Sequence, residues 1–196
     1  MKYFLWLLRI ILGVLFIFSG LVKANDPMGL VYKMDEFFEV LQMSCKESHW
    51  NTLADFMGFM SHYSFAFSVT MIAFEIVCGV AVLVGYAFRF FSTLLLLLNI
   101  FFTFLTGYAL YSGKIKECGC FGACIPLSPH ATFYKDVVLT IMSIIVFIYH
   151  GRISSIFNRH VSTATFIISV VFSASVQWWA LEHLPFNDCI YSFIHK

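Results

Sequence analysis

Long apolar runs separated by short polar stretches dominate this chain. The runs cover residues 4–22, 65–86, 90–111, 131–149 and 161–181. Each is close to the ~20 residues with which a helix, rising 1.5 Å per residue, crosses a hydrocarbon layer of ~30 Å. Segments of ~10 alternating residues, the pattern of a membrane β-barrel, are not seen. The pattern predicts an all-α integral membrane protein, a four-helix transmembrane bundle plus a fifth transmembrane helix.

The polar stretch after the first run, residues 24–63, has a pattern of its own. Apolar residues recur at helical spacing over residues 32–41 and again over residues 53–60. This spacing is typical of amphipathic helices that lie at a membrane interface. We expect two short helices that form a cap over one end of the bundle. Because no internal repeat is present, residues 1–196 are predicted to form one transmembrane domain.

Composition agrees with this pattern and narrows the class of partner. Of the 196 residues, 60% are hydrophobic and 12% are charged, whereas about a quarter are charged in a soluble domain. Membrane lipid is therefore the expected surrounding. The formal net charge of +1 gives no reason to expect a nucleic acid as partner.

The distribution of basic residues predicts an orientation. The first run is interrupted by Arg9, and we interpret it as a retained helix and not as a cleaved signal peptide. With the N-terminus inside, the inner segments carry no acidic residue, and they hold Lys2 and all four arginines: Arg9, Arg89, Arg152 and Arg159. A high density of Lys and Arg in short loops is typical of the cytoplasmic side. We predict a multi-pass protein of the bacterial inner membrane with a cytoplasmic N-terminus and an extracytoplasmic segment between the third and fourth runs.

That segment carries the most distinctive chemistry of the chain, the sequence Cys118-Gly119-Cys120 followed by Cys124. A disulfide between residues i and i+2 needs a backbone turn, which Gly119 favours. Such a small ring is strained, and strained, exposed disulfides tend to be the labile, catalytic ones. We therefore assign Cys118 and Cys120 to a redox pair.

Cys124 has two interpretations, as a resolving thiol or as one half of a structural disulfide with Cys45 or Cys189. Five cysteines lie in the predicted outer segments, and the odd number leaves at least one outside an intramolecular pairing. A third interpretation is a metal site that adds His130 to the thiols. Its spacing does not match the common paired Cys-x-x-Cys sites, so no metal is assigned.

Among the polar residues of the first three predicted spans are Glu75, Asn99 and Arg9. Ionisable groups in a membrane are costly and usually have partners. One hypothesis is a proton or quinone site in which Glu75 exchanges protons while electrons pass to the outer thiols. The alternative is contact between helices, with Glu75 hydrogen-bonded to Asn99 or Arg9.

A charged pair, Lys135-Asp136, stands at the start of the fourth run. Asp136 would complement the dipole of a helix N-terminus. Lys135 would favour the thiolate form of a nearby cysteine. The alternative for Lys135 is an anchor at the helix end.

These residues together resemble a known family. The first run and the residues just after it have Arg9, Gly13, Phe16, Ser19-Gly20, Lys23, Asp26-Pro27, Gly29 and Lys33; the second run has Glu75 and Gly79; Cys118-Gly119-Cys120-Phe121-Gly122 and Lys135-Asp136 follow. The pattern resembles the DoxX-like membrane proteins, and among them the MauE-like (methylamine utilisation) branch, related to DoxD. The resemblance extends over the first four runs. It implies a four-helix membrane core that handles disulfides beside a thioredoxin-like partner, and the DoxD relation implies a membrane quinone.

The functional hypothesis is a thiol–disulfide redox protein that exchanges electrons between extracytoplasmic protein thiols and a membrane quinone. Its predicted catalytic residues are Cys118, Cys120, Cys124 and Lys135, and its predicted quinone-site residues are Glu75, Asn99 and Arg9. The alternative is a non-enzymatic subunit or scaffold of a larger envelope complex, in which the cysteines form structural disulfides.

Overall fold

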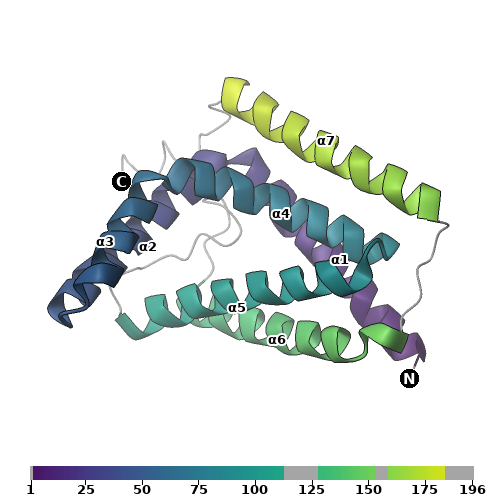
Figure 1. Cartoon of the computed structure of the whole chain (residues 1–196), viewed down its shortest axis with the longest axis horizontal. Coiled ribbons are helices and arrows are strands. Elements are labelled where there is room, and N and C mark those ends of the chain that lie inside the picture. The colour runs from purple at the N-terminus through teal and green to yellow at the C-terminus, as the bar shows by residue number, and fades with distance from the viewer. Residues whose placement is uncertain (1, 113–127, 153–158, 184–196) are drawn as a thin grey trace.

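The structure, a computed structural model, describes residues 2–112, 128–152 and 159–183 (Figure 1). Within these ranges it contains seven α-helices, one 3₁₀ turn and no strand. Five helices are long and apolar enough to cross a membrane: α1 (Lys2–Asn25), α4 (Ser64–Val84), α5 (Phe88–Ser112), α6 (Pro129–Ile148) and α7 (Arg159–His183). The prediction of an all-α membrane protein is confirmed. Both ends of each of the five predicted runs lie within three residues of the ends of the corresponding apolar helix segment.

Helices α1 and α4 form a close antiparallel pair that glycines make possible. A Cβ atom on Gly79 would lie 2.9 Å from the carbonyl oxygen of Gly13, and one on Gly20 would lie 2.6 Å from Cγ1 of Ile76. Small residues let membrane helices approach to backbone contact, where van der Waals packing holds them. The register of these contacts also brings the end of α1 beside the middle of α4.

Helices α5 and α6 form a second antiparallel pair, which is joined by side-chain hydrogen bonds. Nδ2 of Asn99 donates to Oγ of Ser143 over 2.6 Å. The hydroxyls of Thr103 and Thr140 lie 2.8 Å apart. Such bonds connect helices in lipid, where apolar burial gives no driving force between them.

The cap consists of α2 (Pro27–Glu47) and α3 (Asn51–His62), both longer than the helices predicted over residues 32–41 and 53–60. Helix α2 starts early because Asp26 caps it, its Oδ1 accepting from the Gly29 N–H over 2.9 Å, and because Pro27 takes the first helical position. We call the end of the bundle that carries α2 and α3 the hairpin end. There Oγ of Ser44 on α2 lies 2.6 Å from Oη of Tyr108 on α5.

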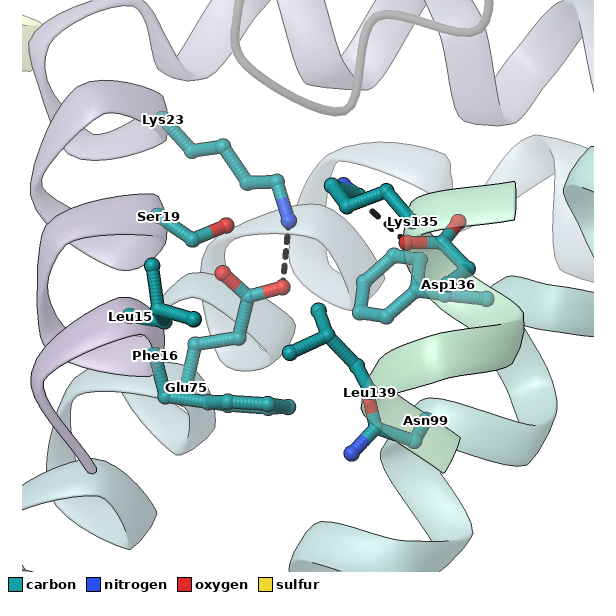
Figure 2. Close-up of a pocket in the computed structure, with 10 residues that line it drawn as sticks. Leu15, Phe16, Ser19, Lys23, Glu75, Asn99, Lys135, Asp136 and Leu139 are labelled. Carbon is teal, nitrogen blue, oxygen red and sulfur yellow. Dashed lines mark hydrogen bonds and ion pairs between the residues drawn. The ribbon is translucent and has the colours of Figure 1, made fainter. Parts of the chain in front are cut away.

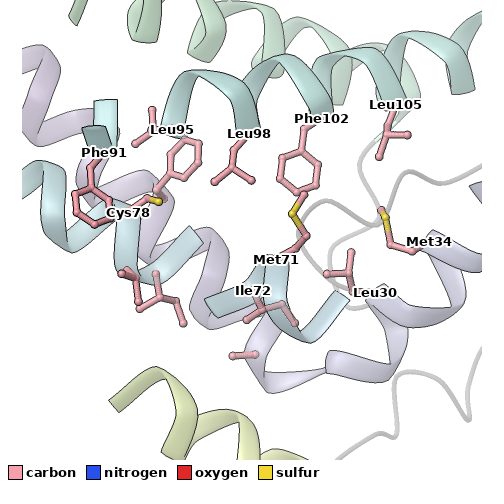
Figure 3. Close-up of a cluster of buried hydrophobic side chains, with 14 of the residues drawn as sticks. Leu30, Met34, Met71, Ile72, Cys78, Phe91, Leu95, Leu98, Phe102 and Leu105 are labelled. Carbon is pink, nitrogen blue, oxygen red and sulfur yellow. The ribbon is translucent and has the colours of Figure 1, made fainter. Parts of the chain in front are cut away.

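The cap is also part of the main core. Leu30 and Met34 of α2 are buried in the same cluster as Met71 of α4 and Leu105 of α5 (Figure 3). Cys78 of α4 is fully buried in this cluster, where a free cysteine packs as a small apolar residue. Helix α2 therefore fixes α4 and α5 at the hairpin end in addition to covering them.

Helix α7 packs along the outside of α4, on the side away from α6 (Figure 1), and contacts α5 where the ring centroid of Phe166 lies 5.3 Å from that of Phe91. Its buried face is made of small and polar side chains: Ser162, Ser169, Ser173, Gln177 and Ala180. Most of its large apolar side chains are exposed, as expected for a helix that faces lipid. The four-helix core of α1, α4, α5 and α6 thus has its fifth helix on one side only.

Candidate functional site

A polar cavity of about 60 Å³ lies inside the four-helix core, between the α1–α4 pair and the α5–α6 pair (Figure 2). Four of its lining residues are apolar: Leu15, Phe16, Phe102 and Leu139. The other six are polar: Ser19, Lys23, Glu75, Asn99, Lys135 and Asp136. Ionisable residues inside membrane segments usually mark a functional site. This cavity is the candidate site.

The first charged pair in the cavity joins α1 to α4. Nζ of Lys23 donates to Oε1 of Glu75, and the two side chains are 3% and 2% exposed. The ammonium also lies 4.2 Å from the ring centroid of Phe102, a cation–π contact with α5. Lys23 belongs to the last turn of α1 and its long side chain reaches back to the carboxylate, as Figure 2 shows.

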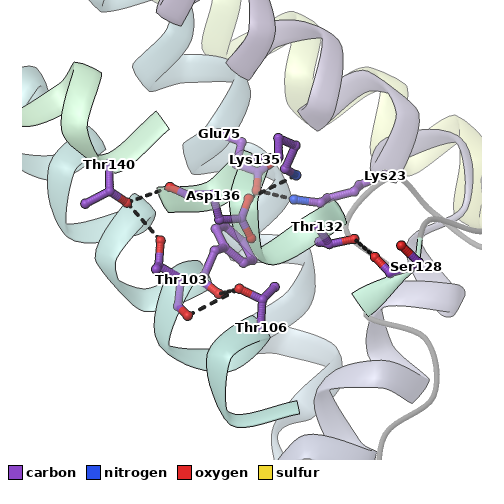
Figure 4. Close-up of polar contacts among 10 residues, drawn as sticks. Lys23, Glu75, Thr103, Thr106, Ser128, Thr132, Lys135, Asp136 and Thr140 are labelled. Carbon is purple, nitrogen blue, oxygen red and sulfur yellow. Dashed lines mark hydrogen bonds and ion pairs between the residues drawn. The ribbon is translucent and has the colours of Figure 1, made fainter. Parts of the chain in front are cut away.

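The second charged pair is carried by α6 alone. Nζ of Lys135 lies 3.0 Å from Oδ1 of Asp136, and the side chains are 28% and 5% exposed. The main chain of Asp136 also accepts a hydrogen bond from Oγ1 of Thr140 over 2.8 Å (Figure 4). The two pairs thus face one cavity from opposite helix pairs (Figure 2).

The position of this second pair corrects an expectation. Helix α6 begins at Pro129, where Oγ of Ser128 caps it by accepting from the Ala131 N–H over 3.3 Å. Asp136 therefore lies about two turns inside the helix, and the dipole effect fades within the first turn. The expected role of Asp136 at a helix N-terminus, and of Lys135 as a helix-end anchor, is wrong. Both residues instead line the cavity.

Each carboxylate keeps one oxygen without a partner. Oε2 of Glu75 and Oδ2 of Asp136 are buried and accept no hydrogen bond from any described residue. A buried acceptor left unsatisfied is costly, and more so when it carries charge. These two atoms are the reactive feature of the cavity, because each is able to accept a proton or a hydrogen bond from a molecule held there.

The expected partners of Glu75 are also corrected. Arg9 donates from Nε to the Val82 carbonyl over 2.6 Å and from Nη2 to the Leu83 carbonyl over 2.7 Å, at the far end of α4. Asn99 lines the cavity, but its amide donates to Ser143. The partner of Glu75 is Lys23.

Arg9 therefore has another role. It lies outside the cavity, with its guanidinium carbon 5.1 Å from the ring centroid of Phe88. It satisfies two carbonyls in the last turn of α4, where a helix leaves its final carbonyls without intrahelical partners. Of the three residues predicted to hold a quinone, the structure brings Glu75 and Asn99 to one cavity and places Arg9 elsewhere.

Sequence reasoning missed Lys23 as a site residue, although Lys23 was part of the family pattern. The signal that was available is a lysine at the end of an apolar run, whose flexible stem lets the charge lie about a helical turn away from its own Cα. The length of the lysine side chain alone does not identify its partner. The partner is 52 residues away along the chain, and only the α1–α4 register brings it within contact.

The predicted thiol residues Cys118, Cys120 and Cys124 lie outside the described residues, as does Cys189. Their segment connects Ser112 of α5 to Ser128, the cap of α6. Cys45 on α2 is half-buried. In the described part of the chain, no three His, Cys, Asp or Glu side chains are grouped to hold a metal ion.

Comparison with known families assigns the chain. The model of the family described as methylamine utilisation protein MauE matches residues 1–149, about three quarters of the 196 residues. The chain belongs to the MauE family. The matched range contains α1 to α6 and the thiol segment, so both charged pairs of the cavity lie inside it and α7 lies beyond it. A search of curated proteins and a search of solved structures gave no match.

Proposed function

We propose that this MauE-family protein is a membrane thiol–disulfide oxidoreductase, with Cys118 and Cys120 as its redox pair and an extracytoplasmic thioredoxin-like protein as its partner. The proposal rests on two closely spaced thiols with a glycine between them, in a chain that otherwise consists of membrane helices. Membership of the MauE family supports a membrane role. The resemblance described above implies, in addition, disulfide handling beside a thioredoxin-like partner.

The observation that carries the proposal is the attachment of the thiol segment. It joins α5, which contributes Asn99 and Phe102 to the cavity, to α6, which contributes Lys135 and Asp136. Cys118 and Cys120 therefore belong to the segment that links the two helices of one wall of the charged cavity. Cys124 would act as a resolving thiol or hold the segment to Cys45 or Cys189.

The proposed exchange is balanced without a further reactant. The thiolate of one cysteine of the pair attacks a disulfide sulfur of the partner, a mixed disulfide forms, and a partner thiolate leaves and takes up a proton. The second cysteine attacks the mixed disulfide and releases the other partner thiol. One dithiol and one disulfide enter, and one disulfide and one dithiol leave. The reverse reaction uses the same steps.

The cavity does not support the predicted quinone site. The volume of about 60 Å³ is well below the ~150 Å³ of an engineered cavity that binds benzene, a smaller ring than any membrane quinone. No quinone step is therefore part of the proposal. The electron acceptor or donor is the disulfide or dithiol of the protein partner.

The proposal includes an orientation in the bacterial inner membrane, with the hairpin end outside and the N-terminus in the cytoplasm. It is supported by the arginines: Arg9, Arg89, Arg152 and Arg159 all belong to the end opposite the hairpin or to the helix turns nearest it. A high Lys and Arg density on one side is typical of the cytoplasmic face.

Trapping of a mixed disulfide tests the proposal. In intact membranes, Cys118→Ser and Cys120→Ser single variants are treated with an acid quench and a thiol-blocking reagent, and covalent adducts are identified by mass spectrometry. We expect one of the two variants to hold a protein partner in a disulfide that the wild type resolves. Cys78→Ala, which removes a buried core thiol, is the matched control and should trap nothing.

Other outcomes of these experiments would contradict the thiol proposal. If Cys118 and Cys120 keep one pairing state under all redox conditions and neither variant traps a partner, the thiol proposal fails. Full cellular function in the Cys118→Ser/Cys120→Ser double variant, together with co-purifying subunits, would favour the alternative of a membrane scaffold with structural disulfides.

A further inference from the structure

We propose that the cavity holds a cluster of water molecules that bridges Glu75 and Asp136, and that this water makes the two carboxylates a proton-exchanging site inside the membrane. The site joins the α1–α4 pair to the α5–α6 pair. It does not depend on the thiol chemistry proposed above.

The first support is the pair of unpartnered oxygens. Oε2 of Glu75 and Oδ2 of Asp136 belong to side chains that are 2% and 5% exposed, and both residues line the same cavity. Neither atom receives a hydrogen bond from a described residue. Buried polar groups in native proteins nearly always have a partner, protein or water. Two such acceptors, on residues that line one cavity, therefore indicate that each has a hydrogen-bond donor there.

The second support is volume. One water molecule needs roughly 10–15 Å³ of cavity space measured with a water-sized probe, together with two to four polar partners. The cavity offers about 60 Å³ and a wall that includes Ser19 and Lys23 besides the two carboxylates. It has room for several water molecules, with these four polar side chains as their hydrogen-bond partners.

The third support is charge. Lys23, Glu75, Lys135 and Asp136 sum to zero when all four are charged, and each ammonium is already paired with a carboxylate. A metal cation or an anion would add an uncompensated charge at low dielectric, which is expensive. A neutral hydrogen-bonding molecule adds none. Water is the smallest such molecule, and the volume of about 60 Å³ accommodates several.

The water has a chemical consequence. A hydrogen-bonded bridge between two carboxylates lets a proton pass from one to the other without movement of either helix. Lys135 is 28% exposed and extends this link toward the surface of α6. Glu75 lies in the middle of a membrane-spanning helix, yet it would exchange protons through Asp136 with the outside of the bundle.

X-ray radiolytic footprinting of the full-length protein in lipid nanodiscs tests the inference. Radicals formed from internal water oxidise the side chains beside it, and aromatic rings are good reporters. The cavity is lined by Phe16 and Phe102, which are 5% and 8% exposed. Phe38 and Phe91, at 5% and 6% exposed, do not line it and serve as matched controls. We expect Phe16 and Phe102 to be oxidised several-fold faster than the controls, with ¹⁸O incorporation from labelled water.

The role of Asp136 is tested in the same assay. Asp136→Leu replaces a carboxylate by an apolar side chain and should lower oxidation of Phe102 toward the control rate. Asp136→Asn, which keeps polar atoms at that place, should retain it. Ser92→Ala removes a buried hydroxyl of α5 that bonds to the Arg89 carbonyl and does not line the cavity, and it should have no effect.

Two results would overturn the inference. Equal rates for the cavity rings and the control rings in the wild type would mean a dry cavity, and this measurement needs no variant. Unchanged oxidation of Phe102 in Asp136→Leu would mean that Asp136 does not hold the water. Because Cys118 and Cys120 take no part, the assay gives the same answer in their double serine variant and separates this inference from the thiol proposal.

Discussion

The two helix pairs that enclose the cavity are held together by different means. In the α1–α4 pair, glycines bring the backbones into contact, and a charged pair, Lys23–Glu75, joins two helices that are far apart in the sequence. In the α5–α6 pair, neutral hydrogen bonds join the helices, and the charged pair lies on neighbouring residues of α6. The first charged pair therefore connects its two helices, whereas the second lies on one helix only.

This difference predicts where substitutions are most damaging. A change in the α1–α4 pair should act on the fold, because it removes backbone packing or leaves a charge buried. A comparable change in the α5–α6 pair should be milder, since each lost hydrogen bond is neutral and other contacts remain. Three substitutions test this comparison, in order of expected effect on the free energy of unfolding.

The largest effect is expected for Lys23→Met. It leaves the Glu75 carboxylate buried without its cation, and breaking a buried ion pair from one side costs about 3–5 kcal/mol. Steric trapping in bicelles would measure the loss. The double variant Lys23→Met/Glu75→Leu should recover most of it, because neither charge is then left buried. A double variant that is as unstable as Lys23→Met would contradict this explanation.

A smaller loss is expected for Gly79→Val. Its Cβ would meet the carbonyl oxygen of Gly13 at 2.9 Å, and backbone cannot move aside as a side chain can. Overpacking of this kind costs about 1–3 kcal/mol. The control on the other pair is Gly107→Ala, whose Cβ would lie 3.1 Å from the ring of Phe133, a side chain free to shift.

Under the same conditions, the free energy of unfolding of Gly79→Val should be well below that of Gly107→Ala. If the two variants are equally stable, close backbone contact is not what distinguishes the α1–α4 pair.

The smallest effect is expected for Thr103→Val. It removes the hydroxyl that lies 2.8 Å from that of Thr140 and keeps the shape of the side chain. Hydrogen bonds between membrane helices contribute about 0.6 kcal/mol on average. Thermal unfolding should therefore show a slight shift, with Thr93→Val, whose exposed hydroxyl bonds within its own helix, as reference. A loss comparable to that of Lys23→Met would mean that the two helix pairs do not differ as described.

The sequence alone predicted the five spans, the all-α class and the two-helix cap. This was possible because few structures are stable in hydrocarbon. The backbone groups of a segment must form their hydrogen bonds within it, and a helix needs about 20 apolar residues to cross the membrane. These conditions depend on residues close together in the chain. The early start of α2 was missed, although Asp26 and Pro27 carry its signal locally.

Only the tertiary structure decided which polar residues meet. The sequence offered Asn99 and Arg9 as partners of Glu75, whereas the glycine-mediated register of α1 on α4 brought Lys23 to it. The same packing set Lys135 and Asp136 across from that pair and left a polar cavity between them. The depth of a residue in the membrane follows from its position along an apolar run. The rotation and register of two helices depend instead on contacts between side chains that are dozens of residues apart in the sequence.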